Sequence, residues 1–135
     1  MKNKVKNTID FIHQTTGTKI AFCYGNKAYE KYMQEQYGLN ETIPHTACTM
    51  ILTKKDTFSL VIGTKKLENI YQLKGVVTHE LSHTVTELMQ YYGFDCDEFR
   101  SYTLQWLYQE IMPSLDARLL KDSIKRDKKK NHTKD

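Results

Sequence analysis

The sequence predicts an α+β fold in a single domain, with a small, mostly antiparallel sheet of about three strands packed on helices. Segments rich in threonine, valine, isoleucine and phenylalanine alternate with segments whose apolar residues recur every three or four positions. The chain of 135 residues is long enough to bury a sizeable core. Its apolar content of 39% and charged content of 27% are ordinary for a globular protein.

The first half of the chain is expected to contain two helices and three strands. In chain order these are a helix over 3–15, a strand over 18–24, a helix over 27–37 and a hairpin formed by 46–53 and 57–64. The first helix is predicted because Val5, Ile9 and Ile12 fall on one side of it. The second is predicted to begin after Asn26, a good N-cap, and to end at Gly38.

The second half is expected to be helical. The predicted helices are 67–92, a segment from Asp95 or Asp97 to about residue 112, and 114–126. Gly75 favours a break within the first of these, and Gly93 is suited to end it in a left-handed conformation. Pro113 is predicted to stop the second, because proline cannot continue the backbone hydrogen bonding of a helix.

The net charge of +4 lies entirely in the last fifteen residues. Residues 1–120 carry 13 basic and 13 acidic residues, whereas 121–135 carry seven basic and three acidic ones. We therefore expect a domain over 1–120 and a basic, flexible C-terminal tail over 121–135. Such a tail attracts nucleic acid through its phosphates, but the composition favours a solvated terminus without a nucleic-acid partner.

The sequence predicts a cytoplasmic protein with no membrane association. No apolar run approaches the roughly 18 residues that a bilayer-spanning helix needs, and the basic N-terminus is followed by polar residues, unlike a signal peptide. The three cysteines form neither a disulfide framework nor a Cys-x-x-Cys pair. They are Cys23, Cys48 and Cys96.

A His-Glu-x-x-His motif lies in the middle of the long predicted helix. Because residues four apart share one face of a helix, His79 and His83 present both imidazoles on the same side. This spacing is typical of two histidines that bind one zinc ion, with the intervening Glu80 acting on a water molecule. The apolar residues of the helix, such as Leu81 and Leu88, lie opposite, as expected for a helix that lines a cleft. The alternative is a pair of surface histidines on a solvated helix.

Catalytic zinc usually takes three protein ligands, so a third is expected nearby. We favour Glu98, which opens a helix that doubles back on the motif helix and is followed one turn later by the small Ser101. Asp95 and Asp97 are alternatives, although carboxylates in a first turn also serve as helix caps. A distant histidine is the remaining possibility, among His13, His45 and His132.

The motif His79-Glu80-x-x-His83 followed by Glu98 resembles the zincin metallopeptidases in their gluzincin form. The order of strands and helices over about 46–112 is similar to minimal members, such as small phage-encoded peptidases and the ImmA/IrrE-like and SprT-like domains. The third histidine of metzincins is absent. The resemblance implies a phage or bacterial zinc-dependent peptidase with Zn²⁺ bound by His79, His83 and Glu98.

The same resemblance implies the mechanism. Zinc lowers the pKa of its bound water, Glu80 accepts the proton as general base, and the peptide bond is hydrolysed. Tyr102 is the candidate oxyanion donor, chosen over Tyr91. A strand over 47–52 forms the rim of the cleft and pairs with a peptide or protein substrate. Two alternatives stay open: an inactive zincin-fold binding or regulatory protein, and a nucleic-acid-associated module that uses the basic tail.

Overall fold

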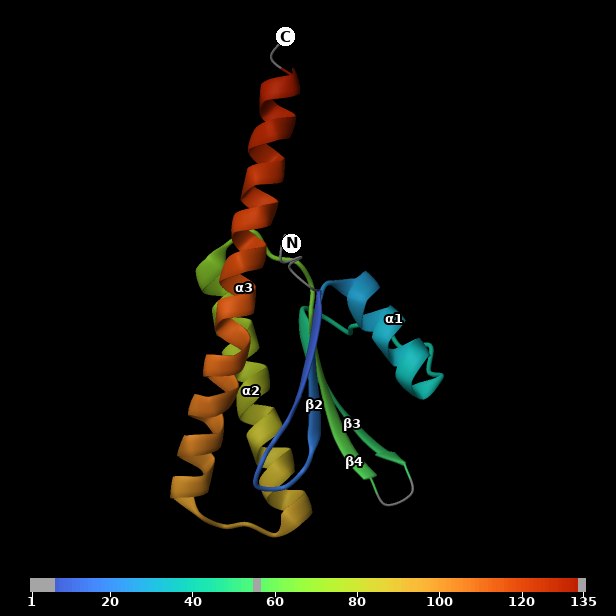
Figure 1. Ribbon diagram of the computed structural model, residues 1–135, viewed down its shortest axis with the longest axis vertical. Helices are drawn as coiled ribbons and strands as arrows, with labels where there is room; N and C mark the ends of the chain where they lie inside the picture. The colour runs from blue at the N-terminus through green and yellow to red at the C-terminus, as the bar shows by residue number, and fades with distance from the viewer. Residues whose placement is uncertain (1–6, 55–56, 134–135) are drawn as a thin grey trace.

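The computed structural model describes residues 7–54 and 57–133. It contains four strands and three helices in these residues, in the order β1, β2, α1, β3, β4, α2, α3 (Figure 1). Their bounds are β1 Thr8–Ile12, β2 Lys19–Tyr24, α1 Asn26–Tyr37, β3 Ala47–Lys54, β4 Thr57–Thr64, α2 Ile70–Tyr92 and α3 Asp97–Thr133. The predicted α+β class is confirmed.

The sheet has four strands in the order β1-β2-β4-β3. The strands β3 and β4 form the expected antiparallel hairpin, and β1 pairs antiparallel with β2. The two central strands, β2 and β4, run parallel, so the sheet is mixed and has one strand more than expected. The strands β1 and β3 lie at its edges.

The additional strand is β1, and the helix predicted over 3–15 is wrong where the structure describes it; residues 3–6 lie outside the described part. The β-branched and aromatic residues of this segment suit a strand better than a helix. Ile9 and Phe11 pack against the core on one face of the sheet, and Asp10 between them is polar. Pairing with β2 satisfies the backbone, so tertiary contacts outweigh the weak helical pattern.

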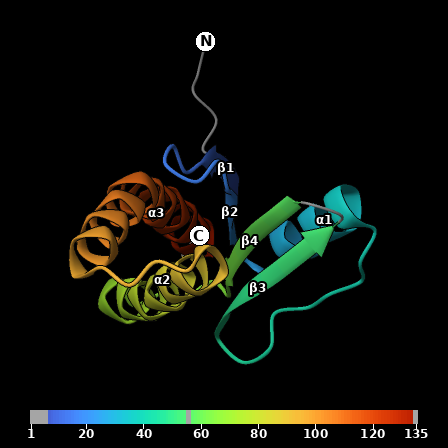
Figure 2. The same ribbon diagram turned by 90° about the horizontal axis from the view of Figure 1, so that it is seen from below.

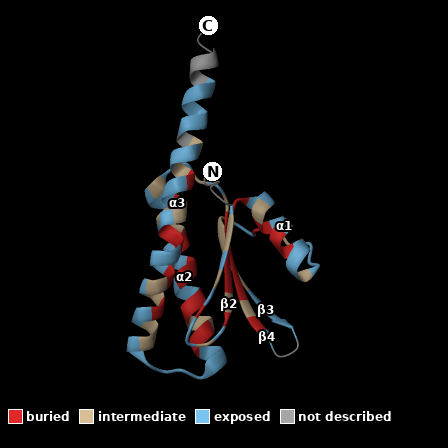
Figure 3. Ribbon diagram, viewed as in Figure 1, coloured by how far each residue is buried: buried red, intermediate tan, exposed pale blue. Residues whose placement is uncertain are grey.

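Helices cover both faces of the sheet. Figure 2 shows α1 on one side and α2 with α3 on the other. The core between the sheet and the helix pair includes Phe22, Leu60, Leu81 and Leu107, and a smaller core lies under α1. Buried residues in Figure 3 accordingly line the central strands and the inner faces of the helices.

The motif helix α2 is continuous from Ile70 to Tyr92, so Gly75 does not break it. Asn69 caps it, because the Asn69 side chain accepts a 3.0 Å hydrogen bond from the backbone N–H of Gln72. Gly93 ends the helix in the predicted left-handed conformation, with φ of 72°. The helix therefore ends as predicted and begins at Ile70, three residues later than predicted.

The third helix, α3, is a single element in which Pro113 is internal, so the predicted pair of helices is wrong. The buried side chains of Ile111, Met112 and Leu115 hold the backbone against α2 and the sheet on both sides of this proline. The helix then continues to Thr133, so the segment expected as a tail begins inside it. No helix in the described residues, this long one included, is apolar enough over a sufficient length to cross a membrane.

Candidate metal centre

The two motif histidines converge on the exposed face of α2. Their Nε2 atoms are 3.1 Å apart, and the ring centroids of His79 and His83 are 4.7 Å apart. Two nitrogens that bind one tetrahedral zinc ion at about 2.05 Å would be about 3.3 Å apart. The pair is therefore arranged so that both nitrogens can reach a single ion with little movement, as their i, i+4 spacing predicts.

The carboxylate between them points in another direction. Glu80 is only 8% exposed and faces the edge strand β3. There the hydroxyl of Thr49 donates a 2.6 Å hydrogen bond to Oε2 of Glu80 and lies 3.2 Å from its backbone oxygen. The same backbone oxygen accepts a 2.9 Å bond from the hydroxyl of Thr84. Glu80 is thus held in place by both the strand and its own helix.

A cavity of about 290 Å³ opens between β3 and α2 at this point. Both Glu80 and His83 line it, so the base and one imidazole face the same space. The full lining is Cys48, Thr49, Ile51, Glu80, His83 and Glu87. A polypeptide lying along β3 would therefore pass the motif residues directly.

Cys48 is half-buried in this cavity. Burial raises the pKa of the Cys48 thiol, and the nearby Glu80 carboxylate adds to the effect. The thiolate is the form that binds zinc or attacks a carbonyl, and it is disfavoured here.

The structure does not bring a third ligand to the histidines. In the described residues, no group of three or more histidine, cysteine, aspartate or glutamate side chains is placed to hold a metal ion. Glu98, the favoured ligand, is exposed in the first turn of α3, and Asp95 and Asp97 are exposed beside it. None of the three joins the imidazole pair.

The lengths of the helices explain this separation. After His83, α2 continues for nine residues, about 13 Å, before it ends. The helix α3 then returns antiparallel, with Arg100 bonded to Thr86 at 3.2 Å and Lys74 paired with Asp116 at 2.9 Å. The histidines therefore lie alongside the middle of the first half of α3, well past its first turn.

Tyr102, the predicted oxyanion donor, lines a different cavity. This cavity of about 310 Å³ lies against the β1–β2 turn and includes His13 and Trp106. Tyr102 is 67% exposed there. His13, one of the alternative ligands, is buried in the same place, where its ring packs against Trp106 at 5.2 Å. The structure therefore pairs His79 with His83, puts Glu80 and His83 in one cavity, and places Glu98 and Tyr102 elsewhere.

Sequence reasoning missed two residues of the cavity. Thr49 carries no local signal, because nothing in a threonine-rich strand indicates which hydroxyl meets a carboxylate. Glu87 carries one: it follows Glu80 by seven residues, which places it two turns further along the same helical face.

No protein-family model, curated protein or solved structure matches this chain. The interpretation of the site therefore rests on its own residues and their arrangement.

Proposed function

We propose that this protein is a zinc-dependent peptidase in which His79 and His83 bind the metal and Glu80 is the general base. One observation carries the proposal: two imidazole Nε2 atoms lie 3.1 Å apart, and one of these imidazoles, that of His83, lines the same cavity as the buried Glu80 carboxylate. Histidine nitrogen is a preferred zinc ligand, and a helical His-Glu-x-x-His arrangement is typical of zinc peptidases.

The donor set fits two of the three protein positions of a catalytic zinc. We keep Glu98 as the proposed third ligand, which requires the first turn of α3 to approach the centre of α2. Only four residues separate Tyr92 from Asp97, so this approach also requires the last turns of α2 to rearrange. Two imidazoles alone bind zinc weakly, so the affinity depends on this third donor.

Side chains and backbone groups of the protein would supply the proton transfer and the substrate binding. A bound zinc ion supplies a water of lowered pKa and polarises the carbonyl of the substrate. The hydroxyl of Thr49 donates its hydrogen bond to Oε2 of Glu80. The other oxygen, Oε1, is left to accept the proton of the attacking water and to pass it to the leaving amine. An edge strand such as β3 has backbone groups that can pair with an extended peptide, which would lie along the cavity.

We also propose a cytoplasmic location. All three cysteines are free, and the half-buried and exposed ones, Cys48 and Cys96, are not paired with each other. Free thiols are typical of a reducing compartment.

The test is a metal analysis combined with a cleavage assay on unfolded protein substrates. The purified protein should hold about one zinc ion per chain, and His79→Ala and His83→Ala should each lose it. Glu80→Gln should keep the metal and abolish cleavage, since its amide cannot accept the proton. Glu87→Gln is the matched control, because it removes a carboxylate from the same cavity and should retain most of the activity. Stoichiometric zinc with full activity of Glu80→Gln would overturn the proposal.

A second candidate is a zincin-like binding or regulatory protein without catalysis. The observation that favours it is the lack of a third donor beside the histidines in the described residues. Absence of both zinc binding and cleavage in a folded sample would select this function.

A further inference from the structure

Figure 1 shows that the parallel strands β2 and β4 finish at the same end of the molecule, and basic residues line two cavities there. These adjoining cavities have volumes of about 510 and 340 Å³, and they share Tyr24 and Lys66. We call the cationic residues that line them the basic surface. It consists of Lys27, Lys65, Lys66, Lys125, Arg126 and Lys129.

Basic residues outnumber acidic ones in the lining of these two cavities. The acidic residues there are Glu68 and Asp122. Glu68 lies 3.8 Å from Arg126, and Asp122 accepts a hydrogen bond from the Tyr24 hydroxyl. Six basic residues against two acidic ones give the lining a formal charge of +4. Three of the six belong to the last fifteen residues, where the net charge of the chain lies.

The fold assembles this surface from three segments that are distant in the sequence. Lys27 lies in the first turn of α1, Lys65 and Lys66 follow β4, and the other three belong to the second half of α3. In Figure 1 this part of α3 extends past the sheet, beyond the start of α1. The N-terminus of α1 adds to the positive potential, because its first turn holds no acidic residue and no side chain caps it.

Gly25 allows two of these segments to meet. It has a φ of 98°, and a Cβ at this position would lie 3.2 Å from Cε of Lys66. A larger residue would push the Lys66 side chain away from the start of α1. The position of the Lys66 side chain beside the start of α1 thus depends on the glycine at this turn.

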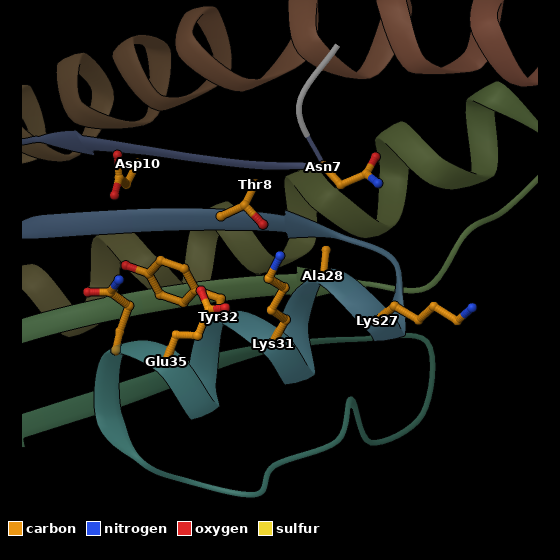
Figure 4. Close-up of a pocket in the computed structure, with 9 residues that line it drawn as sticks. Asn7, Thr8, Asp10, Lys27, Ala28, Lys31, Tyr32 and Glu35 are labelled. Carbon is orange, nitrogen blue, oxygen red and sulfur yellow. The ribbon is translucent and has the colours of Figure 1, made fainter. Parts of the chain in front are cut away.

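A further cavity of about 540 Å³ marks one boundary of the basic surface. It shares Asn7 and Lys27 with the cavity beside it and lies between β1 and α1. Figure 4 shows Asn7 and Lys27 toward one end of this cavity and Asp10 toward the other. The basic surface therefore ends along β1, before the acidic residue Asp10.

We propose that the basic surface binds the phosphate backbone of double-stranded nucleic acid. The attraction of lysine and arginine side chains to phosphate groups supplies most of the sequence-independent affinity for a duplex. A single strand would also require exposed aromatic rings for base stacking, but Tyr24, the aromatic residue of the two cavities, is only 2% exposed. A membrane surface would require exposed apolar side chains among the cations. The two leucines that line the cavities, Leu67 and Leu119, are half-buried, and the more exposed Leu120 and Ile124 line neither cavity.

The experiment measures binding of the full chain to a fluorescently labelled DNA duplex by anisotropy at several salt concentrations. The double variant Lys66→Gln/Lys125→Gln should bind at least about tenfold more weakly and reduce the slope of log K against log salt by about 2. The matched control is Lys19→Gln/Lys54→Gln, which removes the same charge from residues that line neither cavity. It should leave the slope unchanged.

Three outcomes would overturn the proposal. They are no salt-dependent binding of the duplex, equal weakening by the two double variants, and equal or tighter binding of anionic lipid vesicles or of single-stranded DNA. Circular dichroism confirms that both variants are folded. All four substituted lysines are exposed or half-exposed, so a folded variant is expected. The assay contains no peptide substrate and no added zinc, so its result is independent of the proposed peptidase activity.

Discussion

The hydroxyl of Thr49 donates a 2.6 Å hydrogen bond to Oε2 of Glu80 and thereby joins the edge strand β3 to the motif helix. The two residues are 31 positions apart in the sequence. A carboxylate that is only 8% exposed requires such a partner, because burying an unpaired charge is costly. The orientation of the proposed general base is therefore set by a strand, while the imidazoles are set by the helix alone.

Replacement of Thr49 by valine is expected to destabilise the protein. A hydrogen bond to a charged group contributes about 1.5–3 kcal/mol, and the Glu80 carboxylate would lose its strand partner. Thr49→Val should lower the free energy of unfolding in urea by about this amount. Thr49→Ser retains the hydroxyl and should lose well under half as much. Equal losses in the two variants would assign the effect to packing of the methyl group.

The stability should depend on the protonation of His13. This ring is 6% exposed, with Nδ1 2.7 Å from the Thr16 hydroxyl, and burial lowers the pKa of the imidazole. The unfolded chain then binds the proton more readily than the folded one, so stability falls as the pH drops below about 6.5. The contribution is fully present above that pH.

The measurement is the free energy of unfolding between pH 7.5 and 5. In His13→Gln, the slope of the free energy of unfolding against pH should be smaller by up to about 1.4 kcal/mol per pH unit. His45→Asn, at an exposed loop position, serves as the control for the general effect of removing a histidine. A slope unchanged by His13→Gln would contradict the prediction.

Two glycine substitutions should have opposite effects. A Cβ at Gly63 would lie 2.6 Å from Cδ2 of the fully buried Tyr29, so Gly63→Ala forces the ring to move. This variant should lose about 1–3 kcal/mol. A Cβ at Gly75, exposed within α2, would meet nothing within 4 Å in the described residues. Gly75→Ala should gain about 0.5–1 kcal/mol because alanine favours the helix. Thermal denaturation of both variants checks the sign.

Removal of the internal proline should strengthen α3. Pro113 is exposed and lacks the N–H that a helix needs at this position. Pro113→Ala should raise the stability by about 1–3 kcal/mol, and the nearby Ala117→Gly should lower it by about 1 kcal/mol. A lower melting temperature for Pro113→Ala would mean that the packing of Met112 and Leu115 requires the backbone shape that proline imposes.

The sequence determined by itself those features that depend on neighbours within one helical turn or one hairpin. The i, i+4 spacing placed His79 and His83 together, Gly93 ended α2, and the hairpin strands followed their β-branched residues. These patterns depend on residues within one turn or one hairpin, and in these three cases the rest of the fold agrees with them.

Only the tertiary structure decided the features that depend on long-range packing. Pairing with β2 made β1 a strand. Burial of the residues on both sides of Pro113 kept α3 continuous. The lengths of the two helices placed Glu98 far from the histidines. The tertiary structure also joined Thr49 to Glu80 and gathered the lysines of three segments at one end of the sheet. Burial and strand pairing act between residues that are distant in sequence, so no local pattern records them.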